Sequence, residues 1–161
     1  MSTPNSSGAP FSDEELAAWH GLLTLYSRIM RESDRDLLAS HRISLREFDV
    51  LITLFNAPDR RLRMTDLAQR VMLSPSGLTR LVERLERAHL VERQNDSSDA
   101  RSFRTVLTDK GLQRLDDART THNAIIRDHF TDRLNEGELR ELGAIWRKVL
   151  ASNTAQTPTG E

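Results

Sequence analysis

The sequence of 161 residues contains no cysteine, which excludes disulfide bonds, thiol-based redox sensing and cysteine-ligated zinc. It also lacks any apolar run near the roughly 20 residues that a membrane-spanning helix needs. The first ten residues are rich in Ser, Pro and Asn and have no apolar core, so we expect no signal peptide. We therefore expect a cytoplasmic protein that needs no cofactor and does not associate with membranes.

The net charge of −1 is unevenly distributed along the chain. The segment from Arg60 to Arg104 holds ten arginines and six acidic residues, a net charge of +4, and the rest of the chain carries −5. A basic middle within an acidic frame is typical of a local phosphate-binding surface. On charge alone, a chance fluctuation is the alternative.

Helix start signals divide the first half of the chain. Capping boxes at Ser12–Glu15 and Ser44–Glu47 predict one long helix to about Ser40 and a second that stops before Pro58. Thr65 is the expected N-cap of a short third helix. Ser74-Pro75 predicts a fourth, because Ser suits an N-cap and Pro suits the first helical position; this helix should end near His89.

The hydrophobic period then changes from helical to alternating. Residues 90–94 and 102–107 are expected to form two short strands around a polar turn at 95–100. Thr108 and a capping box at Asn135–Glu138 predict two further helices. The order predicts a mainly α fold with a small β-hairpin wing, a winged helix-turn-helix. We expect one domain over residues 12–150, with a lobe at 44–107 and disordered tails at 1–11 and 151–161.

The helix after Ser74 has the residue types that DNA recognition requires. A recognition helix lies in the major groove, and small or hydrogen-bonding residues at its start contact bases and phosphates. Arg80 is placed to contact a guanine edge with two hydrogen bonds. In the wing, Asp99 should orient Arg101, which could then enter a narrow minor groove. The predicted DNA contacts are Ser74, Ser76, Gly77, Thr79, Arg80, Arg84, Asp99, Arg101 and Arg104. A capped surface helix and a surface ion pair are the alternatives.

Three motifs together resemble the MarR family of bacterial transcriptional regulators. They are Asp99-x-Arg101, Leu107-Thr108-x-x-Gly111 and the segment from Ser74 to Arg80, and the resemblance covers residues 12–150. It implies a homodimer formed by the N- and C-terminal helices, about 12–40 and 109–150, in which two winged lobes bind an inverted repeat of double-stranded DNA. It also implies a repressor that a small aromatic or anionic ligand releases.

The resemblance places such a ligand where the dimerisation helices meet the DNA-binding lobe. The candidates there are Trp19, His41, Asp66 and His122. Trp19 could stack on an aromatic ring and a histidine could pair with a carboxylate, while a core role is the alternative for each. The five histidines have no close metal-binding spacing, so we expect no metal site.

Other functions remain open at this point. An architectural protein that binds DNA without sequence preference would use phosphate contacts alone, and an interaction module could retain the fold without binding DNA. An enzyme is not expected, because the sequence has no Gly-rich phosphate loop and no recognisable nucleophile–base pair.

Overall fold

The computed structural model describes the backbone of residues 10–96 and 99–154, and the side chains in these ranges except those of 96, 99–102 and 152–154. The helices are α1 (Asp13–His41), α2 (Leu45–Phe55), α3 (Met64–Arg70), α4 (Pro75–Arg87), α5 (Asp109–His129) and α6 (Glu136–Thr154). The strands are β1 (Arg61–Arg63), β2 (Val91–Asp96) and β3 (Asp99–Leu107), and short 3-10 turns span Pro58–Arg60 and Thr131–Arg133.

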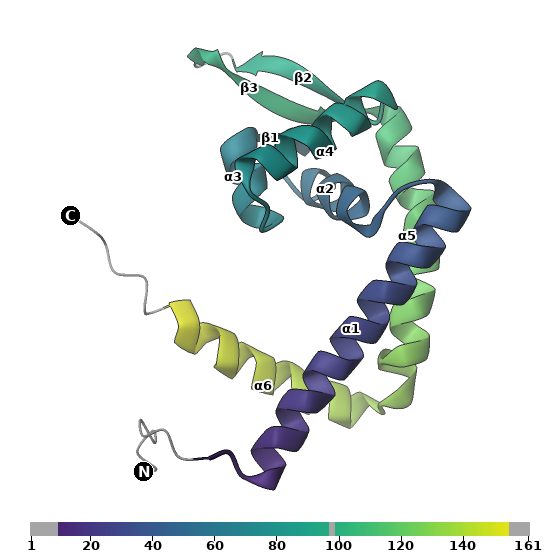
Figure 1. The fold of residues 1–161 in the computed structure, drawn as a ribbon, viewed down its shortest axis with the longest axis vertical. Coiled ribbons are helices and arrows are strands. Elements are labelled where there is room, and N and C mark those ends of the chain that lie inside the picture. Colours follow the sequence, from purple (N-terminus) through teal and green to yellow (C-terminus); the bar gives the residue numbers. More distant parts are fainter. Residues whose placement is uncertain (1–9, 97–98, 155–161) are drawn as a thin grey trace, which may run out of the picture.

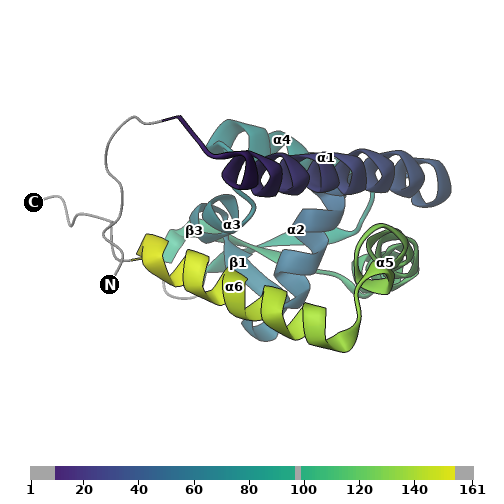
Figure 2. The ribbon, with the colours of Figure 1, turned by 90° about the horizontal axis from the view of Figure 1, so that it is seen from below.

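Two parts of the molecule are distinguishable (Figure 1). The helices α2, α3 and α4 and the sheet form a compact lobe, while α1 and α5 run side by side away from it and α6 projects from their far end. The view from below separates α6 from α1 (Figure 2). This arrangement confirms the mainly helical winged fold.

The lobe contains the core that holds α4 in place. Many of its fully buried side chains come from α2, α3 and α4, among them Leu51, Leu54, Leu67, Leu78 and Val82. Burial of each such leucine contributes about 1.5–3 kcal/mol. A rigid core under α4 fixes the position of its outward face.

The predicted capping signals are confirmed at most helix starts. Ser12 and Ser44 each form a full capping box, and the side chain of Thr108 accepts a hydrogen bond from the Gly111 amide. Asn135 Oδ1 accepts from the amide of Glu138, and the Glu138 carboxylate accepts from the amide of Asn135. Local sequence therefore sets these boundaries.

The prediction that Thr65 caps the third helix was wrong. The N-cap is Arg63, which makes no side-chain capping bond, and α3 begins at Met64. The reason is β1, a strand that the sequence did not predict: Arg61–Arg63 pair with Arg104–Val106 of β3, so the chain turns from strand into helix before reaching Thr65.

The wing is a three-stranded antiparallel sheet in the order β1-β3-β2 rather than an isolated hairpin. Its two long strands extend beyond the predicted ranges, to Asp96 and from Asp99. At the other end of the chain, α6 continues through Thr154, so the segment expected as a tail from residue 151 begins as helix. The predicted tails otherwise fall on residues outside the described ranges, except for residues 10 and 11, which have no regular secondary structure.

Candidate nucleic-acid interface

The start of α4 is built by its cap. Ser74 Oγ accepts a hydrogen bond of 3.2 Å from the Gly77 amide, and Pro75 occupies the first helical position. A Cβ on Gly77 would lie 3.1 Å from Ser74 Oγ, so the glycine clears the capping hydroxyl. Ser76 Oγ lies 3.4 Å from Ser74 Oγ. The first turn is therefore a compact, exposed surface of small polar groups.

Arg80 is the first cation on α4, and its side chain is exposed. The buried face of α4 consists of Leu78, Leu81, Val82 and Leu85, so Arg80 points away from the core. It makes no hydrogen bond or ion pair in the part of the chain that the structure describes. An unpaired guanidinium on an exposed helix face is available to donate hydrogen bonds to a base or a phosphate.

The other predicted contacts on α4 are partly occupied within the protein. Thr79 Oγ1 donates a 2.9 Å hydrogen bond to the Pro75 carbonyl, so its proton is used by its own helix. Arg84 Nε lies 3.3 Å from Glu47 Oε1, and Glu47 also accepts from the Ser44 amide in the α2 capping box. Arg84 thus connects α4 to the start of α2, a link that sequence spacing could not reveal.

In the wing, Arg104 lies in the middle of β3 rather than at its tip. It is paired in register with Gln94 of β2 and Arg63 of β1. Asp99 and Arg101 belong to the outer part of β3, but their side chains lie outside the described residues, so their role stays a prediction.

The base of the wing is tied to the end of α4 by residues at the start of α5. Thr108 Oγ1 lies within hydrogen-bonding distance of two carbonyls, 2.8 Å from that of His89 and 3.0 Å from that of Leu90. Lys110 Nζ donates to the Ala88 carbonyl at 2.9 Å. These bonds satisfy carbonyls that a helix end leaves free. We call Thr108, Lys110 and Gly111 the α5 clamp.

Gly111 makes this clamp possible. A Cβ at this position would lie 2.0 Å from the Leu90 carbonyl oxygen and 2.8 Å from Leu107 Cδ1. Only glycine allows α5 to pass this close to the chain that follows α4. In the motif Leu107-Thr108-x-x-Gly111, the sequence indicated that Thr108 caps a helix. The structure adds that Gly111 allows the close approach of α5 to Leu90.

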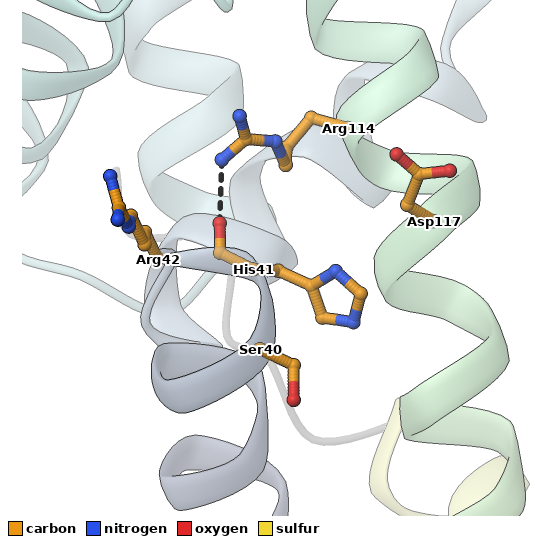
Figure 3. A pocket seen from close by; sticks show the side chains of 5 residues that line it. All are labelled: Ser40, His41, Arg42, Arg114 and Asp117. Atoms are coloured by element: carbon orange, nitrogen blue, oxygen red, sulfur yellow. Dashed lines mark hydrogen bonds between the residues drawn. The ribbon is translucent and has the colours of Figure 1, made fainter.

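The predicted ligand residues do not form one group within a protomer. His41 lines a cavity of about 320 Å³ with Ser40, Arg42, Arg114 and Asp117 (Figure 3), and shares a 2.8 Å hydrogen bond with Thr121. In Figure 3 the Arg114 guanidinium donates a hydrogen bond to the carbonyl oxygen of His41, the last residue of α1. Trp19 precedes His41 by 22 residues of the same helix, a separation of about 33 Å. Asp66 lies exposed on α3.

His122 lies at the junction of three helices. Its Nδ1 is 3.1 Å from Ser33 Oγ of α1, and its ring centroid is 4.8 Å from that of Phe48 in α2. Burial among these groups lowers the pKa of His122 below its ordinary value. The neutral imidazole is therefore the form that fits the fold.

A second cavity, of about 250 Å³, was not predicted. It lies between α1, α2 and the turn before α4, and its lining includes Tyr26, Arg46, Asp49, Arg70 and Met72. Burial raises the pKa of the Asp49 carboxyl, and Arg46 opposes that rise. Its lining thus combines an aromatic ring with two arginines and a carboxyl group, from segments that are distant in the sequence.

Neither a metal-binding cluster nor a membrane-spanning helix is found among the described residues. In residues 10–96 and 99–154, no set of three or more His, Asp or Glu side chains is arranged to hold a metal ion. The helices in these ranges include none that is long and apolar enough to cross a bilayer.

Comparison with known proteins identifies the family. Residues 43–103 match the sequence profile of the MarR family. The structure of AbsC, a MarR family transcriptional regulator from Streptomyces coelicolor, superposes with a TM-score of 0.81 at 30% identity, over 92% of this chain and 99% of AbsC. The chain belongs to the MarR family of transcriptional regulators. This membership confirms the predicted resemblance and the expectation of a regulator rather than an enzyme.

Other MarR-like relatives extend the comparison. Sco3205, a MarR family regulator from Streptomyces coelicolor whose structure was determined in complex with DNA, has a TM-score of 0.83 at 29% identity, over 96% of this chain and 95% of Sco3205. The transcriptional repressor YetL of Bacillus subtilis is 26% identical over 76% of this chain and 75% of its own length. The lobe that carries α4 and the wing is thus shared by regulators of this class.

Proposed function

We propose that this MarR family member is a homodimeric repressor that acts in the cytoplasm and binds an inverted repeat of double-stranded DNA. The observation that carries the proposal is Arg80, exposed and without a partner among the described residues, one turn after the capped start of α4. The core fixes this helix from below, so its outward face is preorganised for the major groove.

Dimerisation is supported by large apolar side chains that are exposed in the part of the chain that the structure describes. Trp19 is 54% exposed, Tyr26 60% and Leu150 63%, and they lie on α1 and α6, the helices outside the lobe. Exposed apolar surface of this kind marks a protein interface. A second copy that covers both helices would hold two α4 helices at a fixed spacing.

We further propose that a small aromatic or anionic ligand releases the repressor. The cavity lined by Tyr26, Arg46 and Asp49 supports this, because it lies between α1 and the lobe, whose relative position sets the spacing of the two α4 helices. A ligand that binds one such arrangement better than another shifts the population toward it.

Binding to the DNA upstream of the protein's own gene tests the proposal. We expect an electrophoretic shift with this DNA and not with a scrambled sequence at the same salt concentration. Arg80→Ala should reduce the preference by about 1–3 kcal/mol at one base pair. Arg87→Ala, the matched control at the last residue of α4, should weaken binding to all sequences equally. Equal binding of both DNAs by the unaltered protein would leave only an architectural role.

A further inference from the structure

A second basic surface lies outside the lobe, in a groove between α1 and the end of α5. The groove has a volume of about 480 Å³ and is lined by Arg28, Arg31, Glu32, Arg35 and His129. This volume lies within the range of small-molecule sites. The proposed DNA-binding function uses none of these residues.

The arginines share one face of α1. Arg28, Arg31 and Arg35 are spaced three and four residues apart, which places their side chains one above another. Like charges at this spacing destabilise a helix. The positive charges in the groove therefore lower the stability of α1, and a bound anion would reduce their repulsion.

The acidic side chains near the groove already have partners within the protein. His129 Nε2 donates a 2.9 Å hydrogen bond to Glu32 Oε2, and Glu32 Oε1 is 3.9 Å from Arg35 Nη2. Asp36 Oδ1 accepts from Arg35 Nε at 2.7 Å. Asp128 lies within 4 Å of both His129 and Arg133.

Two cations remain without a partner. Arg28 and Arg31 are exposed and make no ion pair or hydrogen bond within the described ranges. They border a groove whose far wall, His129, is nearly buried and held in one orientation by Glu32. Two free guanidiniums over a fixed wall are suited to bind phosphate or carboxylate oxygens through charge-assisted hydrogen bonds.

The groove faces away from Trp19 and Tyr26 of the proposed dimer interface. Trp19 and Arg28 are nine residues apart, as are Tyr26 and Arg35, and nine residues make two and a half helical turns. The arginine face is therefore opposite the side of α1 that carries Trp19 and Tyr26. Arg28 also precedes the lobe end of α1 by about 20 Å along the helix.

We infer that this groove is a binding site for a small molecule with two or more negative charges on phosphate or carboxylate groups. The proposal concerns binding alone, so it stands or fails independently of whether the chain represses a gene.

Thermal unfolding of the full chain tests it, because a ligand that binds only the folded state raises the midpoint. Inorganic phosphate and citrate are titrated separately at constant ionic strength, with sodium chloride as the balancing salt. We expect a saturable rise with one or both anions. A response to phosphate alone indicates a phosphate-bearing ligand, and a response to citrate alone indicates a polycarboxylate. No rise with either anion overturns the proposal.

Two double variants with equal charge change locate the site. Arg28→Ala/Arg31→Ala should weaken anion binding by about tenfold or more, with a midpoint in the absence of anion that is equal to or higher than that of the unaltered protein, because repulsion along α1 is removed. Arg80→Ala/Arg87→Ala, which changes α4, should leave anion binding unaltered. The reverse pattern would place the anion on the DNA-binding face and overturn the proposal. A change of DNA affinity or of oligomeric state in the Arg28/Arg31 variant, with anion binding unchanged, would also overturn it.

Discussion

At the scale of single residues, Gly111 shows how one missing side chain determines an arrangement of helices. The Leu90 carbonyl occupies the space where a Cβ would lie, at 2.0 Å. The contact is with backbone, which cannot rotate away as a side chain can. Position 111 is therefore fixed by the packing of α5 against the end of α4.

Gly111→Ala should lower the free energy of unfolding by more than about 2 kcal/mol, because α5 must move away from Leu90. Urea denaturation followed by circular dichroism measures this change. Gly21→Ala is the matched control: nothing lies within 4 Å of its Cβ, so it should stabilise α1 by about 0.5–1 kcal/mol. Equal effects of the two substitutions would contradict the steric explanation.

His122 leads to a prediction about pH. Burial lowers its pKa in the folded protein below the ordinary value of 6.5. The unfolded chain therefore binds more protons near that pH, and the stability contributed by the neutral ring is complete above it. As the pH falls through 6.5 toward the lower folded pKa, this stability is lost.

The free energy of unfolding should accordingly fall between about pH 7 and pH 5.5, and His122→Gln should reduce the slope. Chemical denaturation at a series of pH values measures it. His20→Gln, at an exposed position of α1, serves as the control and should leave the slope unchanged. A His122→Gln slope equal to that of the unaltered protein would rule out this residue as the source.

At the scale of elements, the α5 clamp joins the start of α5 to the end of α4. Thr108 caps α5 and also hydrogen-bonds the carbonyls of His89 and Leu90. Because these bonds join the start of α5 directly to the end of α4, a displacement of α5 would also displace the end of α4. This is a physical route by which a change between α1 and α5 could alter DNA binding.

Thr108→Ala should destabilise the protein by about 1–2 kcal/mol, because the α5 cap and the bonds to the α4 end are lost together. Thr108→Ser retains the hydroxyl and should recover most of this loss. Differential scanning calorimetry of the three proteins compares them. A serine variant as unstable as the alanine variant would show that the threonine methyl group, rather than the hydroxyl, is responsible.

The same elements show how far sequence alone could lead. The capping boxes at Ser12 and Ser44 and the Ser74-Pro75 start were predictable, because a helix start depends on residues three or four apart. The strand β1 was not, since three residues become a strand only by pairing with β3, about 40 residues later. The short helix α3 starts without a side-chain cap, so the sequence carried no local signal for the residue at which this helix begins.

The candidate site residues likewise divide into those that local sequence predicts and those that depend on contacts between distant residues. Arg80 was predictable from its place after a helix start, whereas the Arg84–Glu47 pair and the contacts of His41 and His122 join residues 37 to 89 positions apart. Such contacts follow from the packing of α1, α2 and α5. The groove at Arg28 and Arg31 likewise depends on His129, which only the fold brings beside α1.

At the scale of the whole molecule, the exposed apolar faces of α1 and α6 predict a dimer. Trp19→Glu should weaken the dimer by about tenfold or more, because it puts a charge into a buried apolar contact. Sedimentation velocity over a range of concentrations measures the change. His20→Glu introduces the same charge one residue away, outside the apolar face, and should have little effect. A Trp19→Glu protein that remains as dimeric as the original would exclude this face of α1.

In the proposed dimer, the interface sets the spacing of the two DNA-binding helices. Two α4 helices in a two-fold symmetric dimer contact half-sites about one helical turn apart, roughly 10 base pairs. The most direct test of the account is fluorescence anisotropy with an operator and with a version that has five base pairs inserted between its half-sites. We expect the insertion to reduce affinity to that of a single half-site, because it turns the second half-site to the opposite side of the DNA. Equal affinity for both DNAs would contradict a dimer that binds an inverted repeat through two fixed recognition helices.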